Sequence, residues 1–290
     1  MARRAGAVNV RREGSVVKLI LRPFVHIGEP SDFRPEDDIH SELGRRLEEL
    51  KQDDACRVIV ITGLVDGEFL CPPAASVSPK RARARRDFLR SIWTTWSGPA
   101  RVHQLLASIE KPIVARVNGD AIGFGQSVML GCDIIVARED AHISDVHMSN
   151  RLTERSDGSV IRTPATVPPG DGALAWLPLS MSLPRLKEYL MLGRVLTARQ
   201  LADLGVINHA VPATALDATV DEIVSELLMR SPRMLALTKR LLNRRALTQL
   251  EADLDLSIAY QHIGNLEALE NWQPESSIEP PVSRRGRGKR

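Results

Sequence analysis

The stretch from Lys111 to Ala137, KPIVARVNGDAIGFGQSVMLGCDIIVA, constrains the fold of this chain more than any other. It predicts a buried strand over 113–117, a helix over about 124–131 and a second buried strand over 134–137, because short β-branched runs without alternation are typical of strands covered on both faces. Glycines 119, 123 and 125 allow a tight turn and a close approach of the backbone to a ligand. Free N–H groups at the start of the helix, near Phe124, suit a developing negative charge. A strand-to-helix turn without chemistry explains the glycine spacing equally well.

The composition favours a folded, cytoplasmic protein. The chain has 290 residues, of which 43% are hydrophobic, enough for one large core or two modest domains. No apolar run reaches the length of a membrane span, and the first residues, MARRAGAVNV, lack the apolar region of a signal peptide. The three cysteines are well separated and lack metal-ligand spacing, so we expect reduced thiols and no metal site.

The formal charge of +3 is concentrated in two basic clusters, KRARARR at 80–86 and SRRGRGKR at 283–290. Such clusters bind nucleic acids or membranes in some proteins, but an exposed run of charges is more often simply solvated. We therefore expect neither a nucleic acid nor a membrane as partner. The segment from 273 onward is rich in Pro, Ser, Glu and Arg, which predicts a flexible basic tail over 273–290.

Strands and helices alternate in the first half of the sequence. Apolar strands are predicted at 16–21 and 58–62, with apolar residues at helical spacing between them, from Ile39 to Leu50. This rhythm favours a stacked α/β core. The second half predicts helices at 184–192, 197–204, 217–229, 234–243 and 250–263, with Thr197 as an N-cap.

These features resemble the crotonase superfamily, which includes the enoyl-CoA hydratases and isomerases. The resemblance rests on 111–137 and is supported by IVITG at 59–63, LTARQLADLGVINHAVP at 196–212 and SPRMLALTKRLLN at 231–243. It implies a ββα spiral core over 1–205 and a C-terminal helical region over 206–272 that forms subunit contacts, in a homotrimer or a dimer of trimers. In this family two backbone N–H groups hold a thioester carbonyl oxygen while an enolate forms.

The resemblance implies that Phe124 supplies one of these two N–H groups. The other falls in GEFLCPPAA at 67–75, where an ungapped match puts Pro73 at the donor position and a shift of one residue puts Ala74 there. Proline has no amide hydrogen, so either Ala74 is the donor or the hole is half-built. The family's acyl-CoA substrate carries coenzyme A, which is not a separate cofactor here. Arg22 is a weak candidate for its phosphates.

Both glutamates of the family's hydratases are missing. Ser127 and His147 stand at their positions, and the imidazole has a pKa suited to proton transfer, unless His147 is only a surface residue. The resemblance also indicates Asp171, in the PGDG turn, as acid or base, although an aspartate there can be a simple helix N-cap. Asp145 lies within reach of the same loop, or is only a turn residue. The predicted substrate contacts are Cys71, Pro73, Ala75, Gly123, Ser127, Asp145 and Val146.

Two local sequences, PPGDGALAW at 168–176 and EADLDLSIAYQ at 251–261, are similar to the 6-oxocamphor hydrolases. These crotonase relatives split a C–C bond of a cyclic diketone without coenzyme A. Phe124 and Gln261 depart from that pattern, in which a histidine and a glutamate are expected. We expect an enoyl-CoA hydratase or isomerase-like enzyme, with the C–C hydrolase of a β-diketone as the first alternative. A non-catalytic assembly subunit is the second.

The stretch 148–166 is polar, basic and without periodicity, which predicts a long loop. It is longer than the corresponding segment of crotonase relatives. We expect either a lid over the site or a disordered surface insertion.

Overall fold

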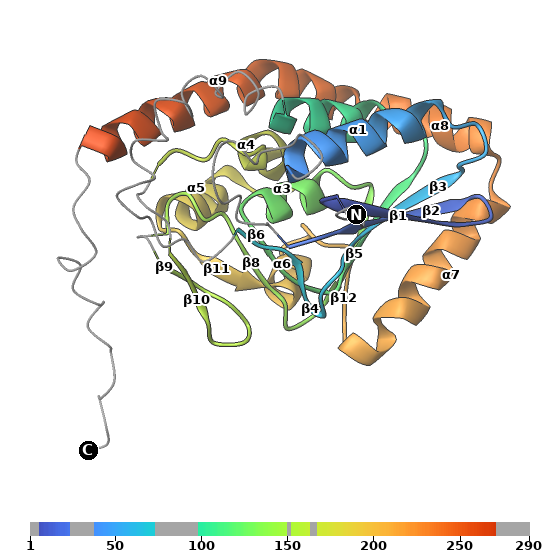
Figure 1. Ribbon diagram of the computed structural model, residues 1–290, viewed down its shortest axis with the longest axis horizontal. Helices are drawn as coiled ribbons and strands as arrows, with labels where there is room; N and C mark the ends of the chain where they lie inside the picture. Colours follow the sequence, from blue (N-terminus) through green and yellow to red (C-terminus); the bar gives the residue numbers. More distant parts are fainter. Residues whose placement is uncertain (1–5, 24–37, 73–97, 150–151, 163–166, 271–290) are drawn as a thin grey trace, which may run out of the picture.

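The computed structural model describes residues 6–23, 38–72, 98–149, 152–162 and 167–270 (Figure 1). In the first half, strands surround three helical segments: β1 (Val8–Glu13), β2 (Val16–Leu21), α1 (Ile39–Gln52), β3 (Val58–Gly63), β4 (Gly67–Leu70), a helical stretch through 98–108, β5 (Ile113–Val117), β6 (Gly119–Ile122), α3 (Phe124–Leu130), β7 (Ile134–Arg138) and β8 (His142–Ser144). The second half is mostly helical: β9 (Leu152–Glu154), β10 (Val160–Arg162), α4 (Ala173–Trp176), η3 (Leu177–Leu179), α5 (Leu183–Met191), β11 (Val195–Thr197), α6 (Ala198–Asp203), β12 (His209–Val211), η4 (Ala213–Ala215), α7 (Leu216–Met229), α8 (Pro232–Leu242) and α9 (Arg244–Glu270).

A six-stranded sheet in the order β1-β2-β3-β5-β7-β12 forms the centre of the fold. All neighbours pair in parallel except β1 and β2. Alternate residues of β3 face opposite sides: Ile59 and Ile61 belong to the main core, whereas Val58 and Val60 pack with the apolar face of α7. Burial of both faces explains why these strands are continuous apolar runs, as predicted from the sequence.

A second sheet has the strand order β11-β8-β6-β4. Its strands β4, β6 and β8 directly follow β3, β5 and β7 of the first sheet along the chain. Asn118 joins the two sheets, because its Oδ1 accepts from the Gly63 N–H of β3 at 2.9 Å and its Nδ2 donates to the Glu68 carbonyl of β4 at 3.1 Å. Gly119 then lies so close to β4 that a Cβ would sit 1.8 Å from the Gly67 carbonyl carbon. Only glycine fits at this contact.

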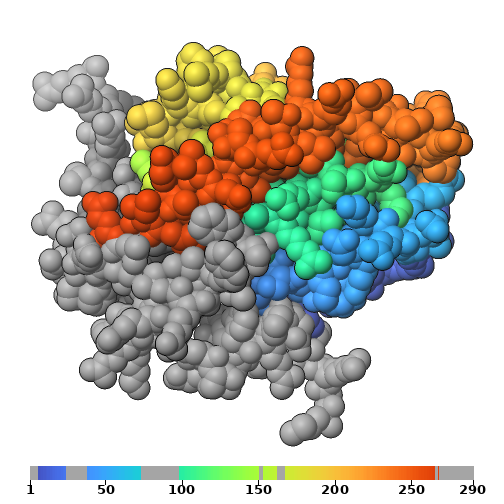
Figure 2. Space-filling view, turned by 90° about the horizontal axis from the view of Figure 1, so that it is seen from above, coloured from blue at the N-terminus to red at the C-terminus, as the bar shows by residue number. Residues whose placement is uncertain are grey.

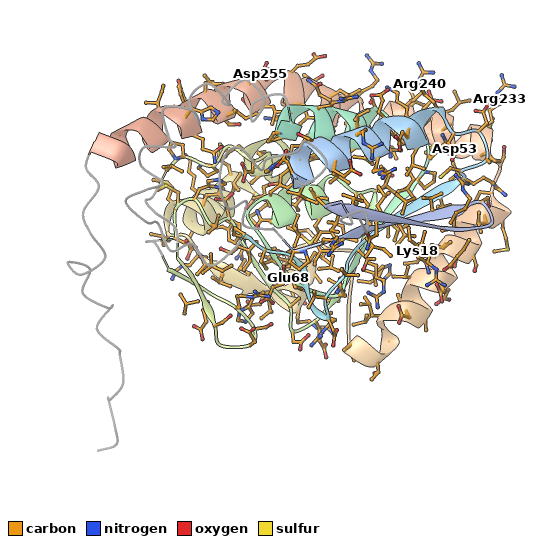
Figure 3. The ribbon with its side chains drawn as sticks, viewed as in Figure 1. Lys18, Asp53, Glu68, Arg233, Arg240 and Asp255 are labelled. Carbon is orange, nitrogen blue, oxygen red and sulfur yellow. The ribbon has the colours of Figure 1, made fainter. Side chains whose placement is uncertain are left out.

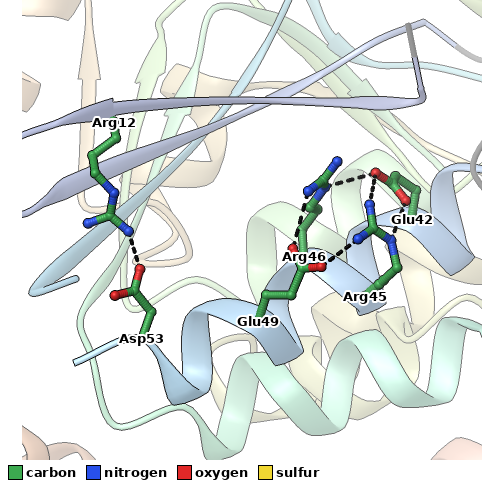
Figure 4. A network of polar contacts seen from close by, with 6 residues as sticks. All are labelled: Arg12, Glu42, Arg45, Arg46, Glu49 and Asp53. Atoms are coloured by element: carbon green, nitrogen blue, oxygen red, sulfur yellow. Dashed lines mark hydrogen bonds and ion pairs between the residues drawn. The ribbon is translucent and has the colours of Figure 1, made fainter. Parts of the chain in front are cut away.

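Helix α1 packs its apolar face on the main core. Ion pairs between Glu and Arg side chains of the same helix lie on its other face (Figure 4). The buried carboxylate of Glu42 accepts from Arg45 at 2.6 Å and from Arg46 at 2.8 Å, at helical spacings of three and four residues. Asp53, just beyond the helix, pairs with Arg12 of β1. These contacts fix α1, whose first turn approaches the candidate site.

Helix α9 crosses the upper face of the molecule and contacts α4 (Figures 1 and 2). Figure 2 shows it lying between the segment that contains α4 and α5 and the helical residues 98–108. On α8, Arg233 and Arg240 point away from the protein body (Figure 3), alongside exposed apolar side chains such as Leu241. Within the described residues, no helix is both long and apolar enough to cross a membrane.

The loop predicted over 148–166 is wrong for 152–162. These residues form an antiparallel hairpin of β9 and β10, with Gly158 at φ +80° in the connecting turn. The Arg155 guanidinium anchors the hairpin, because it donates to Glu68 of β4 at 2.8 Å. Glu68 is labelled in Figure 3. The Ser156 N–H donates to the buried Asp120 carboxylate at 2.9 Å. The Asp157-Gly158 pair is a hairpin signal, but three-residue strands are too short to show periodicity.

Candidate active site

The turn from β6 into α3 places the Phe124 N–H at the start of a helix. Gly123 has φ +61°, and its own N–H donates to the Ser144 carbonyl at 2.9 Å. No side chain caps this helix, and N–H groups in a first helical turn have no partner within the helix. The other glycine, Gly125, allows close packing, since a Cβ there would lie 2.0 Å from the Leu70 carbonyl oxygen.

Beside this turn, His147 lies buried between two carboxylates. Its Nδ1 is 2.9 Å from Asp145 Oδ1, which also accepts from the His147 backbone N–H at 3.0 Å. On the opposite edge of the ring, Nε2 lies 3.4 Å from Asp171 Oδ2. The Nε2 atom also lies 2.7 Å from the side-chain nitrogen of Gln261 on α9. Strand β8, the PGDG turn and the C-terminal helix therefore meet at one imidazole.

Two opposing effects, burial and nearby charge, set the pKa of His147. Burial opposes the charged imidazole, but the carboxylates of Asp145 and Asp171 outweigh it and raise the pKa of His147 well above 6.5. Burial likewise opposes charge on Asp171, yet His147 lowers the pKa of that carboxyl to about 2. When His147 is protonated, the two side chains therefore form an ion pair.

Asp171 is not the helix cap that the alternative prediction made it. The N-cap of α4 is Gly172, in the left-handed conformation at φ +102°, and no side chain caps the helix. The Asp171 backbone carbonyl lies 2.7 Å from Nε2 of His103, which is fully buried. The preceding Gly170 lies against Gln261, leaving no room for a Cβ. The carboxylate is thereby directed at His147.

His40 flanks the same site from the first turn of α1. Its Nδ1 lies 3.0 Å from Asp38, the N-cap of that helix, and its ring centroid is 4.2 Å from that of Phe124. Although burial opposes it, the hydrogen bond to Asp38 raises the pKa of His40. The Asp38 contact gives this histidine a hydrogen-bond partner next to the candidate site. The Phe124 ring is itself buried between His40 and His103.

The remaining predicted residues lie in different places. Ser127 is fully buried and its hydroxyl donates to the Gly123 carbonyl at 3.4 Å. Cys71 and Val146 share an apolar cluster with Ile122 and Ile161, separate from the main core. Their assignment to substrate binding stays a prediction. Pro73, Ala74 and Ala75, and hence the first oxyanion donor, lie outside the described residues.

Arg22 is the residue predicted to contact the phosphates of coenzyme A. Arg22 directly follows β2, where its backbone N–H donates to the Ala7 carbonyl at 2.9 Å, and its phosphate role stays a prediction. Lys239 is buried and bonded to Asp133 at 2.7 Å, so it holds α8 against the sheet. In the described part of the chain, no cluster of three or more His, Cys, Asp or Glu side chains could hold a metal ion.

Comparison with known proteins decides the family. A model of the enoyl-CoA hydratase/isomerase family matches residues 36–267. The chain belongs to the enoyl-CoA hydratase/isomerase family. It is therefore a member of the crotonase superfamily with a crotonase-like α/β fold, as the sequence predicted.

Individual relatives of this family member are distant. A hydroxycinnamoyl-CoA hydratase-lyase from Pseudomonas fluorescens is 26% identical, over 81% of this chain and 82% of the relative. The crystal structure of an enoyl-CoA hydratase/isomerase from Mycobacterium paratuberculosis has a TM-score of 0.72 at 22% identity, covering 91% of this chain and 98% of that one. A β-diketone hydrolase from Anabaena has a TM-score of 0.70 at 21% identity, covering 91% and 95%. The two structural likenesses show the fold.

Two supporting groups were not foreseen from the sequence. His103 lies on the helical stretch 98–108, which the sequence analysis did not assign, and no spacing links it to the PGDG turn. Tyr189 on α5 was likewise missed, although its hydroxyl bonds to the buried Gln126 and, at 3.3 Å, to the Ile143 carbonyl. Both are buried, and neither residue type alone indicates a role in a site.

Proposed function

We propose that this family member hydrolyses the C–C bond between one carbonyl carbon and the central carbon of a β-diketone, with His147 as the proton carrier. The observation that carries the proposal is buried His147 held between the buried carboxylate of Asp145 and the partly exposed carboxylate of Asp171. In the neutral ring, the Asp145 carboxylate keeps the proton on Nδ1, so Nε2 is the basic atom. The Gln261 amide N–H, 2.7 Å from Nε2, holds this lone pair in the resting site and must give way to water before Nε2 takes a proton.

The proposed reaction consumes one water molecule. Neutral His147 takes a proton from water at Nε2, and the hydroxide oxygen bonds to one carbonyl carbon. The bond from that carbon to the central carbon then breaks, and its electron pair forms the enolate of the second carbonyl. The Phe124 N–H stabilises the enolate oxygen, and the imidazolium returns its proton to the central carbon. The products are a carboxylic acid and a ketone.

Two features favour this reaction over hydration by paired glutamates. Ser127, at the position of one glutamate, is fully buried and its hydroxyl is already bonded to the backbone. A histidine between carboxylates, by contrast, can take up a proton and return it within one cycle. Asp171, with its pKa near 2, is ionised and so supports the imidazolium rather than donating a proton.

A second candidate is enolate formation from an acyl-CoA thioester, as in the hydratases and isomerases of the family. It is favoured by the family match over residues 36–267, and it needs the same His147 and Phe124. The thioester carbonyl would take the place of the diketone carbonyl, and coenzyme A would be part of the substrate. Asp171 again supports the imidazolium.

A substrate panel separates the two candidates. Cyclic β-diketones and acyl-CoA thioesters are each incubated in H₂¹⁸O, and products are followed by mass spectrometry. Diketone hydrolysis puts one ¹⁸O atom into the new carboxylate, and we expect this turnover to fall about 10²-fold or more in Asp171→Asn. Asp157→Asn, on the exposed hairpin turn, is the control. Turnover of thioesters alone would favour the second candidate, and full activity of Asp171→Asn would contradict both.

We also propose that the C-terminal helices make subunit contacts in a trimer. Leu241 and Leu242 on α8 are 70% and 71% exposed, which is unusual for adjacent leucines on a monomer surface. Light scattering tests this proposal, since a mass of one chain at micromolar concentration would contradict it.

A further inference from the structure

His103 is a buried titratable residue that has no role in the proposed reaction. It lies on the helical stretch 98–108 and is fully buried. Its ring makes two hydrogen bonds, one at each nitrogen: Nε2 lies 2.7 Å from the Asp171 carbonyl oxygen, and Nδ1 lies 3.0 Å from Nε1 of Trp176. The ring therefore bridges Asp171, two residues before α4, and Trp176, the last residue of α4.

The chemistry of these partners fixes the tautomer of His103. An indole nitrogen can only donate, so the Trp176 N–H requires an unprotonated Nδ1. A carbonyl oxygen can only accept, so Nε2 of His103 carries the proton and donates it to Asp171. Both bonds exist together only in the neutral ring. Burial acts in the same direction and lowers the pKa of His103 to about 4, while the charge of Asp171 opposes it.

The backbone at this turn is shaped to receive the ring. Gly172 is in the left-handed conformation, and a Cβ on it would lie 2.2 Å from His103 Nε2. The other side of the ring meets Phe124 edge to face, with centroids 5.9 Å apart. His103 thus contacts both the turn that carries Asp171 and the residue that begins α3.

We propose that His103, held as the neutral Nε2–H tautomer by Trp176, is a positioning residue that fixes the Asp171 turn so that its carboxylate reaches His147. The inference rests on the proposed role of His147 and Asp171. His103 does not touch the reacting atoms and acts through the Asp171 backbone. Its loss should therefore lower turnover more than substrate affinity, and should weaken the ion pair of Asp171 with His147.

Histidine NMR tests the geometry without any substrate. In ¹⁵N-labelled protein we expect His103 Nδ1 to resonate as an unprotonated nitrogen from pH 8 down to about pH 5, because its pKa is about 4. Trp176→Phe removes the indole donor and should move the titration of His103 toward 6.5. A protonated Nδ1 in the wild-type protein at pH 7, or a His103 titration unmoved in Trp176→Phe, would overturn the proposal.

Three variants test the consequence for the site. In His103→Leu, which can make neither bond, we expect kcat to fall about 10²-fold with KM within about twofold, because small misplacements of reacting groups cost rates of this size. The titration of His147 should also move to lower pH as Asp171 retreats. His103→Gln retains an acceptor and a donor and should recover part of both losses. His209→Gln, at the exposed first residue of β12, should behave as wild type.

The outcomes separate this inference from the proposed function. If wild-type protein turns over neither diketones nor thioesters, the proposed function fails, but the His147 titration in the His103 variants still decides the positioning role. A folded His103→Leu with an unchanged His147 titration and, where turnover is measurable, an unchanged kcat would overturn that role. If His103→Leu does not fold, the same titration is read in His103→Gln and Trp176→Phe, and an unchanged result in both would overturn it too.

Discussion

Replacing Asp145 with asparagine removes one charge beside His147 while keeping the shape of the side chain. The carboxylate is buried, and one of its oxygens, Oδ1, receives both bonds from His147. The second oxygen has no hydrogen-bond partner among the described residues, so the carboxylate charge acts mainly on the imidazolium. The amide oxygen of an asparagine would still accept a hydrogen bond but would carry no charge.

The effect of Asp145→Asn follows from the geometry. Two charges about 4 Å apart interact by about 4 kcal/mol at an effective dielectric constant near 20. Even a third of this energy would shift the pKa of His147 by about one unit. Since the carboxylates raise the pKa of His147, removing the charge of Asp145 lowers it. The neutral asparagine also holds the ring less firmly in its tautomer, so we expect kcat to fall about 10²- to 10⁴-fold.

The assay is the pH dependence of kcat/KM on the best substrate. If neutral His147 is the base, wild-type activity rises with pH through the raised pKa, and in Asp145→Asn the inflection moves toward acid by about one pH unit or more. Asp140→Asn is the matched control, because its carboxylate is 59% exposed and pairs with Arg138 at the surface. An inflection at the same pH in Asp145→Asn and wild type would refute the electrostatic argument, and a flat wild-type profile would remove His147 as the base.

Three further substitutions test the fold around the site. Gly119→Ala should destabilise the protein by about 3 kcal/mol or more in urea unfolding, because its Cβ would collide with the β4 backbone, whereas Gly44→Ala meets only ordinary contacts and should be tolerated. Lys239→Met leaves the Asp133 carboxylate without its cationic partner, although the Ile113 N–H still donates to it, and should cost about 3 kcal/mol at pH 7. Burial raises the pKa of Asp133, so this loss should shrink toward pH 4, and a loss independent of pH would contradict the ion-pair explanation. Arg155→Ala should speed amide hydrogen exchange in β9 and β10 but not in β3, and equal rates in wild type and variant would show that the hairpin does not depend on its anchor.

The same ion pair gives stability a pH dependence with a defined sign. The folded-state pKa of His147 is raised, so its contribution is present below the unfolded value of about 6.5 and is lost as pH rises through the folded value. The folded-state pKa of Asp171 is lowered to about 2, so its contribution is present above 3.8 and is lost as pH falls toward 2. Both contributions are therefore complete only between about pH 4 and 6.5.

Sequence patterns predicted the long strands that are buried on both faces and missed the strands of three or four residues, including the fully buried β6. The strands at 16–21, 58–62, 113–117 and 134–137 are continuous apolar runs, and the structure confirms them as β2, β3, β5 and β7. Strand β1 has only Val8 buried, and β8, β11 and β12 have three residues each, too few to establish a period. Pairing with neighbouring strands, which sequence alone does not reveal, creates these elements.

The candidate site was predictable where a residue occupies a position with a known role. His147 and Asp171 follow from such positions, and the structure brings them within 3.4 Å of each other. His103 was not predictable in this way, because its contacts with Asp171 and Trp176 depend on how the helical stretch 98–108 packs against the turn before α4. Gln261 was noticed only as a departure from a glutamate, and nothing in the sequence indicated its contact with the imidazole.

The bond between Gln261 and His147 joins residues 114 positions apart, and it places the last helix over a cluster made from the middle of the chain. During synthesis at about 5 to 20 residues per second, roughly 6 to 23 s separate the emergence of these two partners from the ribosome. Until α9 is made, the imidazole lacks its contact with Gln261. A chain truncated before α9 would therefore retain the sheets and α3 but not this hydrogen bond, which orders His147 from the far end of the sequence.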